Sequence, residues 1–206
     1  MTPAEAPDDL EDFDGENFDD AGLSGQRWLR RNYTGCSFRD ADLSELRTEA
    51  VVFTDCDFSG ADLGSSEHRG SAFRTCIFTR TNLWQSVFRH ASLLGSTFAD
   101  CRMRPLTFEE VDLTLVSLGG ADLRGVDFTR CRLREANLVQ ADLRKAVLRD
   151  ADLAGARTNG LRLEEADLRG ARVDAGLWTS AALFGARIDL TQAVGYAAAQ
   201  GLRVDP

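Results

Sequence analysis

The chain has 206 residues, of which 43% are hydrophobic and 28% are charged, and its formal net charge is −9. This length is sufficient for a buried core. The sequence contains no apolar run near the roughly 18 residues of a membrane span, and its acidic N-terminus lacks the basic start of a signal peptide. The composition argues against a membrane or secreted protein, so we expect a cytoplasmic location.

Most of the negative charge lies at the N-terminus. Residues 1–30 hold nine acidic residues and two arginines, whereas the rest of the chain is nearly neutral. Acidic segments of this kind favour disorder. We expect residues 1–27 to be an acidic tail that is disordered or partly caps the first coil of the region that follows, because an open repeat end exposes core and unpaired backbone.

From Tyr33 to Ile188 the sequence has a period of five. Of the 32 positions reached in steps of five, 29 are large apolar residues, and the exceptions are Thr48, His68 and Thr158. At 28 of the 32 positions two residues earlier, the side chain is small. Neither a helix nor an isolated strand has this period. A short repeat that buries one large and one small side chain per unit indicates a β-solenoid.

We expect residues 28–190 to form about eight coils of twenty residues, each with four sides. All five cysteines fall on the small inward position, and the first three are spaced by twenty residues. We interpret them as small buried residues, because the sequence has no C-x-x-C pair and only two histidines. The predicted repeat core includes Phe38, Phe58, Phe78, Leu123 and Leu143.

Several positions within the repeat are unusual. Glycines at many predicted corners suit a positive φ angle; they are Gly35, Gly60, Gly125, Gly155, Gly170 and Gly185. His68 occupies a core position, which predicts a coil that bulges outward. Pro105 cannot donate a backbone hydrogen bond, which predicts a local change of turn or a small kink.

The last segment breaks the period of five and has helical character. Asp189 to Thr191 are suited to a helix start and Gly201 to a helix end. We expect residues 191–206 to form a helix that caps the last coil and contributes to a dimer. Phe184 follows a core leucine and should point outward. The candidate dimer residues are Phe184, Leu190, Val194, Ala197, Ala198 and Leu202.

The repeat resembles the A-[DN]-L-x-x pattern of the pentapeptide-repeat family, for example at Ala41-Asp42-Leu43 and Ala141-Asp142-Leu143. That resemblance implies a right-handed quadrilateral parallel β-helix. Residues 67–74, 131–135, 141–145 and 192–199 further resemble the mycobacterial fluoroquinolone-resistance branch of the family. The branch implies a homodimer joined at its C-terminal ends that binds DNA gyrase at the DNA-binding saddle or the ATPase subunit. It also implies imitation of duplex DNA without direct nucleic acid binding, and fluoroquinolone resistance.

A DNA mimic needs carboxylates in rows. When outward residues are sorted by side of the coil, no side is purely acidic. Local rows remain, with Asp122 stacked on Asp142 and Asp42 stacked on Asp62. A solvated surface of mixed charge is the alternative. The gyrase-facing candidates are Asp122, Asp142, Asp152, Glu164, Glu165 and Asp174.

An enzyme and a protein-interaction scaffold are the two alternative classes of function. The sequence has no catalytic order of Ser, His and Asp, no phosphate loop and no metal cluster, so we expect no enzyme activity, metal or cofactor. A protein interaction scaffold with an unknown partner is the alternative to gyrase binding. Outward Trp84, Leu94 and Leu115 would suit such a surface.

Overall fold

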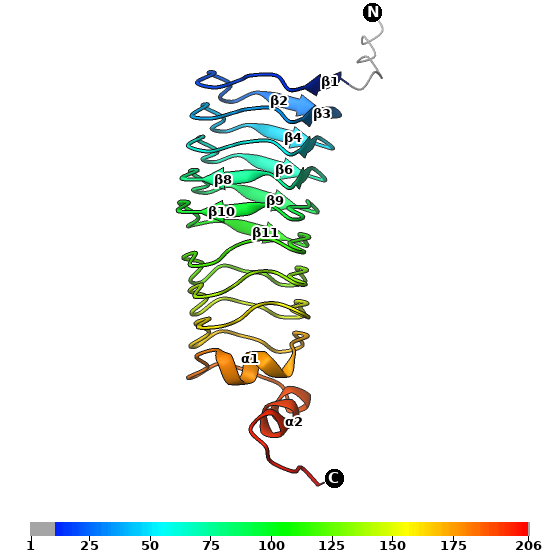
Figure 1. Cartoon of the computed structure of the whole chain (residues 1–206), viewed down its shortest axis with the longest axis vertical. Helices are drawn as coiled ribbons and strands as arrows, with labels where there is room; N and C mark the ends of the chain where they lie inside the picture. Colours follow the sequence, from blue (N-terminus) through cyan, green and yellow to red (C-terminus); the bar gives the residue numbers. More distant parts are fainter. Residues whose placement is uncertain (1–10, 206) are drawn as a thin grey trace, which may run out of the picture.

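The protein is a straight rod of stacked coils, seen in a computed structural model that describes residues 11–205 (Figure 1). Each coil has four sides of five residues, and the residues that pair between neighbouring coils are twenty positions apart in the sequence. The register begins with Glu11 opposite Arg31, and the last bridge joins Asp167 to Arg187. The structure confirms the expected quadrilateral parallel β-helix.

Short parallel strands form parts of three sides of the rod. One sheet has the order β1-β3-β5-β7, another β11-β9-β6-β4-β2, and β10 pairs with β8. The strands are β1 (Glu11–Asp14), β2 (Arg27–Leu29), β3 (Arg31–Thr34), β4 (Arg47–Glu49), β5 (Val52–Thr54), β6 (Glu67–Arg69), β7 (Ala72–Arg74), β8 (Ile77–Thr79), β9 (Val87–Arg89), β10 (Thr97–Ala99) and β11 (Thr107–Glu109). Beyond β11 the coils stay joined by single parallel bridges.

The β-helix begins earlier than the sequence analysis expected. Residues 11–27, assigned there to the acidic tail, form most of a first coil that bonds to the second, for example through Phe18 N–H and the Ser37 carbonyl at 2.7 Å. Phe13 and Phe18 stack on Tyr33 and Phe38 at 4.7 and 4.9 Å between ring centroids. The large apolar residue of each five-residue unit is therefore sufficient to continue the β-helix where the residue two positions earlier is not small. Residues 1–10 of the expected tail lie outside the described residues.

Left-handed backbone at every fifth residue makes the corners. The φ angle is positive at the six predicted glycines and also at twenty residues other than glycine, such as Asp40 and Lys145. Aspartate at the second position of a side often accepts the backbone N–H two residues on, as Asp42 does from Ser44 at 3.0 Å. This bond supports the corner locally. The series skips Pro105, where the Arg104–Pro105 peptide bond is cis, so the expected local change of turn is present.

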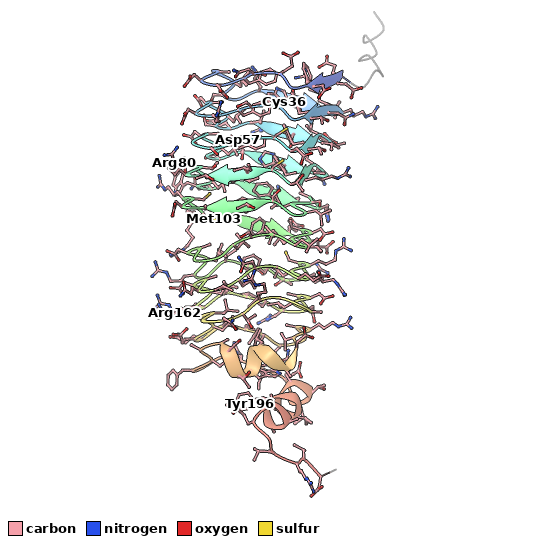
Figure 2. All side chains as sticks on the ribbon, in the orientation of Figure 1. Cys36, Asp57, Arg80, Met103, Arg162 and Tyr196 are labelled. Atoms are coloured by element: carbon pink, nitrogen blue, oxygen red, sulfur yellow. The ribbon has the colours of Figure 1, made fainter. Side chains whose placement is uncertain are left out.

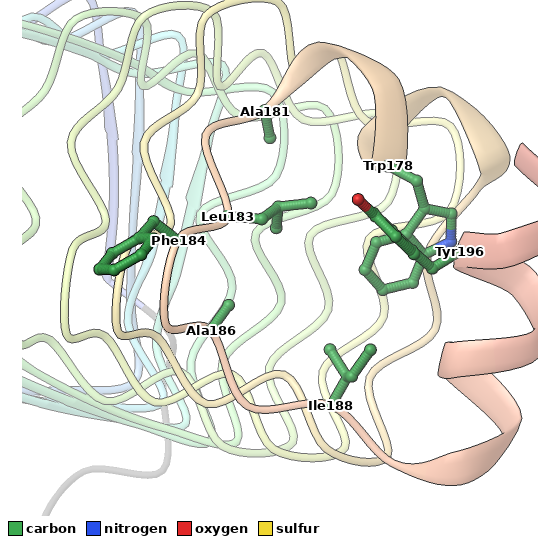
Figure 3. Close-up of a pocket in the computed structure, with 7 residues that line it drawn as sticks. All are labelled: Trp178, Ala181, Leu183, Phe184, Ala186, Ile188 and Tyr196. Atoms are coloured by element: carbon green, nitrogen blue, oxygen red, sulfur yellow. The ribbon is translucent and has the colours of Figure 1, made fainter. Parts of the chain in front are cut away.

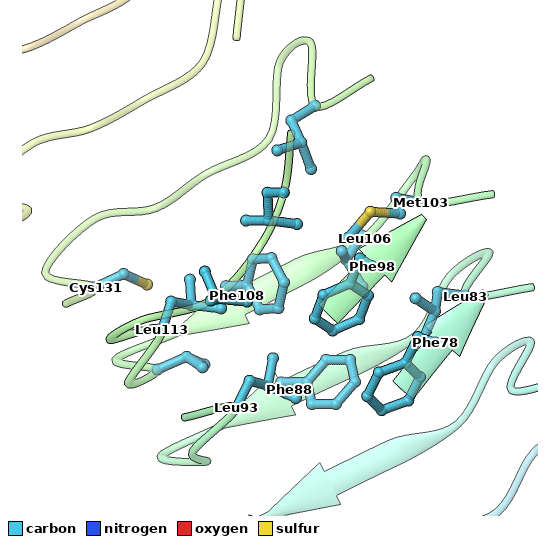
Figure 4. Packing of buried hydrophobic residues seen from close by; sticks show 14 of the residues in the cluster. Phe78, Leu83, Phe88, Leu93, Phe98, Met103, Leu106, Phe108, Leu113 and Cys131 are labelled. Carbon is cyan, nitrogen blue, oxygen red and sulfur yellow. The ribbon is translucent and has the colours of Figure 1, made fainter. Parts of the chain in front are cut away.

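Large side chains stack in columns inside the rod (Figure 4). Phe38, Phe58 and Phe78 are fully buried, with neighbouring rings 5.0 Å apart. Leu123 and Leu143 are also fully buried, which confirms the predicted core. The five cysteines are free thiols; four are buried and Cys101 is partly buried. Burial raises the pKa of the Cys131 thiol to about 11.

His68 is the exception to the apolar core, and the predicted outward bulge is wrong. The imidazole is 1% exposed and lies 4.7 Å from Phe88 and 5.0 Å from Phe73 between ring centroids. Its two ring nitrogens are bonded to the hydroxyls of Thr48 at 2.8 Å and Ser66 at 3.0 Å. Because these neighbours satisfy both nitrogens, the ring remains in the column, and burial lowers its pKa to about 3.

Two helices close the C-terminal end. Helix α1 (Ala175–Ser180) replaces one side of the last coil, a departure from the expected β-helix over residues 28–190, and buries Trp178. Helix α2 (Leu190–Ala199) starts one residue before the predicted helix of residues 191–206 and is shorter. Asp189 is its N-cap in a capping box with Gln192. Gly201 follows the helix with a φ of 80°, as predicted.

Candidate protein-interaction surfaces

The predicted acidic row of Asp122 and Asp142 is present, but both carboxylates are paired with arginine. The two residues form a parallel bridge one coil apart. Asp122 accepts hydrogen bonds from Arg124 at 2.7 and 2.8 Å and from Arg104 at 2.8 and 2.9 Å. Asp142 accepts bonds from Arg144 at 2.7 and 2.8 Å. Hydrogen bonds from Arg124 and from Arg144 hold the pKa of the respective carboxyl below its usual range.

The other four acidic candidates do not form one continuous row. Asp152 lies on a different side of the coil and is paired with Arg134 at 3.1 Å. Glu164 faces Arg162 at 3.4 Å, and Glu165 faces Lys145 at 3.6 Å.

Asp174, the fourth of these candidates, precedes helix α1 and accepts the Gly155 backbone N–H at 2.6 Å. The C-terminal half of the rod therefore presents mixed charge with many direct ion pairs. The side chains project outward from the coils, as Figure 2 shows for Arg162.

Charge is instead separated along the rod. Residues 11–70 hold fourteen acidic and six basic residues, whereas residues 71–206 hold sixteen acidic and eighteen basic residues. Asp42 and Asp62 bridge one coil apart in the acidic part. Within residues 11–205 no ion pair involves either carboxylate. The charges counted on each side of the coil do not show this separation. The charges counted coil by coil along the sequence do.

The predicted dimer residues lie at the C-terminal end, where an apolar surface is exposed. Phe184 is 87% exposed and Leu190 83% exposed. Val194, Ala198 and Leu202 are also exposed, and Ala197 is half-buried.

Beside the exposed Phe184 is a hollow of about 390 Å³ (Figure 3). Its walls come from both helices and the last coil: Trp178, Ala181, Leu183, Phe184, Ala186, Ile188 and Tyr196. An exposed aromatic side chain next to an apolar hollow is typical of a protein interface.

The side chains that could bind a metal ion are scattered over residues 11–205. Within residues 11–205 no group of three His, Cys, Asp or Glu side chains is arranged to hold a metal ion. In the same range no helix has both the length and the apolar character needed to cross a bilayer. The surfaces described above are suited to contacts with proteins.

Comparison with known proteins agrees with this architecture. The family model "Pentapeptide repeat region" matches residues 82–158, and "Pentapeptide repeats (8 copies)" matches residues 34–66 and 146–174. The chain belongs to the pentapeptide-repeat family.

One curated relative and two solved structures are similar to this chain. The chain is 60% identical over 43 residues to the pentapeptide repeat protein MfpA of Mycobacterium tuberculosis. That match covers 21% of this chain and 24% of the relative.

The fold also resembles QnrB1, a plasmid-mediated fluoroquinolone resistance protein. A trypsin-treated form has a TM-score of 0.71 at 20% identity, covering 95% of this chain and 98% of QnrB1. The full-length form has a TM-score of 0.70 at 19% identity, covering 94% and 98%. At this identity the likeness is one of fold.

Proposed function

We propose that this protein binds DNA gyrase, modulates its supercoiling activity and protects it from fluoroquinolones. The observation that carries the proposal is the 60% identity to MfpA over 43 residues. The likeness of fold to a fluoroquinolone resistance protein over nearly the whole chain supports it. The proposed action is non-catalytic and needs no cofactor. A cytoplasmic location follows, because gyrase acts on the chromosome there.

Electrostatic imitation of DNA is the proposed means of binding. A negatively charged rod is attracted to the basic channel in which gyrase holds DNA. Coils within residues 11–70 supply most of the net negative charge. Asp42 and Asp62 therefore join the six acidic candidates, and the six remain proposed contacts along the rest of the rod. The DNA-binding saddle and the ATPase subunit both remain candidate surfaces of gyrase.

We also propose that two copies join through their C-terminal ends. Phe184 from one copy would enter the hollow beside Trp178 of the other, which would remove apolar surface from water. The two acidic ends would then lie at opposite tips of a long dimer. This arrangement supports DNA imitation, because it keeps the tips free for a partner.

The test is a supercoiling assay with gyrase of the same organism, with increasing protein and with or without a fluoroquinolone. We expect inhibition of supercoiling, fewer drug-stabilised DNA breaks, or both. A type I topoisomerase acting on the same plasmid is the control, because a protein that simply coated DNA would inhibit both enzymes. No effect on gyrase in either arm would contradict the proposal and favour a scaffold with another partner.

A further inference from the structure

A column of arginines lies beside Asp122 and Asp142, and these arginines have no part in the function proposed above. On the side in question, parallel bridges join residues 42, 62, 82 and 102 in one series and residues 122, 142 and 162 in a second, and we call it the Asp122 side. Two positions further along each coil, Arg104, Arg124 and Arg144 succeed one another at twenty-residue intervals. We call these three residues the arginine column. Trp84 continues the column one coil towards the N-terminus.

Carboxylates hold the arginines in fixed orientations. Arg124 binds Asp122, and Arg144 binds Asp142, each through its Nε and Nη2 atoms. Within residues 11–205 no hydrogen bond uses the Nη1 atom of either arginine. Each guanidinium therefore keeps free N–H groups for a further acceptor. Because these arginine side chains are already ordered, they would lose little further conformational entropy when a ligand binds.

Two hollows lie along the column. One, of about 390 Å³, is lined by Arg104, Arg124, Gly125, Arg144, Lys145 and Glu165. The other, of about 300 Å³, is lined by Arg104, Pro105, Leu106, Arg124, Gly125 and Val126. They share Arg104, Arg124 and Gly125, so the arginines form a common wall. A Cβ atom at Gly125 would have no neighbour within 4 Å, so the corner there is open.

The charge of this region is locally basic in an acidic protein. The side chains along it comprise six basic residues and four acidic ones: Arg102, Arg104, Arg124, Arg144, Lys145 and Arg162, with Asp122, Asp142, Glu164 and Glu165. At the N-terminal end of the column, the Arg102 guanidinium lies 5.3 Å from the centre of the half-buried Trp84 ring. Tryptophan and arginine together are the side chains most enriched at binding hot spots.

We infer that the arginine column is a docking surface for an acidic α-helix of a protein partner, laid along the axis of the rod. In the coils N-terminal to the column, stacked rings of successive coils have their centroids 4.6 to 5.1 Å apart. Acidic residues on successive turns of a helix are about 5.4 Å apart, so three of them match three arginines. Same-side residues of an extended peptide are about 6.8 Å apart and lose register by the third contact.

The acidic row beside the column favours a helix over nucleic acid. A uniformly charged phosphate backbone would also lie against Asp122 and Asp142, which repel it. A helix can place acidic residues on one stripe against the arginines and basic or neutral residues on the next stripe against the aspartates. The Trp84 ring would contact an apolar residue at the end of the same helix.

The test uses the full chain and a labelled helical peptide with glutamates at positions i, i+4 and i+7, followed by fluorescence anisotropy. We expect saturable binding that weakens with added salt and is lost when the three glutamates are replaced by glutamine. The double variant Arg104→Gln with Arg124→Gln should weaken binding about 10-fold or more. Arg169→Gln is the matched control, because Arg169 also donates hydrogen bonds from its Nε and Nη2 atoms to an aspartate, Asp167, but on another side of the rod.

Two further variants keep the test decisive if the double variant is unstable. Trp84→Ala removes the aromatic end without changing charge, and Lys145→Gln alters a side chain that is 69% exposed. Each should weaken the peptide complex by about threefold or more, and Lys145→Gln should do so with an unchanged melting temperature. Equal binding of the glutamine peptide, or equal loss in Arg169→Gln, would overturn the inference. Tighter binding of a single-stranded oligonucleotide that displaces the peptide would also overturn it. None of these readouts involves gyrase.

Discussion

Gln192 donates its side-chain amide to the carbonyl oxygen of Leu168 at 2.6 Å, which joins helix α2 to the last complete coil of the rod. The same amide donates to the Ala171 carbonyl at 2.7 Å, and Gln192 is buried. One coil earlier, the carbonyl at the position equivalent to Ala171, that of Ala151, accepts the Arg172 N–H of the following coil at 2.8 Å. At this end a single side chain takes that role, which a solenoid needs because its last coil has no successor.

Replacing Gln192 should destabilise the C-terminal end selectively. Gln192→Ala leaves the buried Ala171 carbonyl without a donor, at a cost of about 1–3 kcal/mol. The Leu168 carbonyl loses one of its two bonds and keeps the one from the Ala171 N–H at 2.9 Å. Gln192→Glu should cost more, because it places a carboxylate oxygen against those carbonyls. Hydrogen exchange should show faster exchange of amides in residues 161–200 and unchanged exchange in residues 31–100. Uniform acceleration along the rod would show that the end does not open independently.

The buried His68 should make the fold sensitive to acid. Its folded pKa of about 3 lies below the usual 6.5, so the unfolded chain binds more protons between these values. Stability is therefore fully present above about pH 6.5 and falls by up to about 1.4 kcal/mol per pH unit towards pH 3. Urea unfolding at pH 7, 5 and 4 should show a smaller loss for His68→Phe than for the parent chain. The matched control is His90→Ala, which removes the exposed histidine and leaves His68 in place.

Phe58 and Phe184 should respond to truncation in opposite ways. Phe58 is fully buried between two stacked rings, so Phe58→Ala should lower the free energy of unfolding by about 3–5 kcal/mol. Phe184 is exposed, so Phe184→Ala should change stability by less than about 0.5 kcal/mol. In sedimentation experiments Phe184→Ala should instead shift the protein from dimer to monomer. An unchanged sedimentation coefficient would contradict the proposed C-terminal dimer.

Unpaired and paired aspartates should differ in their effect on gyrase. The double variant Asp42→Asn with Asp62→Asn removes two carboxylates that have no ion pair within residues 11–205. It should raise the concentration needed to inhibit supercoiling on the order of 10-fold. Asp122→Asn with Asp142→Asn changes the net charge equally but removes carboxylates that arginines already neutralise, so its effect should be smaller. The reverse order would place the main contact in the C-terminal half.

The architecture was predictable because each five-residue unit has a large apolar residue at the same position, and this alone shows the period. Tyr33 to Ile188 follow it without a shift, and burial of Phe38, Phe58 and Phe78 confirms the interpretation. The left-handed corners were predicted only at glycines. Asp40 and Lys145 adopt the same conformation because the bonds of adjacent coils impose it, and that cooperative effect cannot be seen in one repeat.

Other features depend on particular side-chain contacts that the period of five does not show. Hydrogen bonds to Thr48, and to Ser66 in its own coil, hold His68 in the core. The sequence pattern shows only that a histidine occupies a core position, so it did not predict these bonds. Helix α1 was missed because its residues keep the phase of five at Trp178. The aspartate rows were predicted from the sequence. The structure adds which arginines bond each aspartate, namely those two residues later or eighteen residues earlier in the chain.

The uneven charge of the rod gives the molecule an electric dipole along its long axis. Fourteen acidic and six basic residues over residues 11–70 make one end the negative pole. A dipolar rod rotates in the field of a basic partner before contact, so the N-terminal coils would arrive first. In a dimer joined at the C-terminal ends the two moments oppose and cancel, leaving a quadrupole with two negative tips. Joining two copies would therefore convert a rod with one attractive end into one that a basic surface can capture from either end.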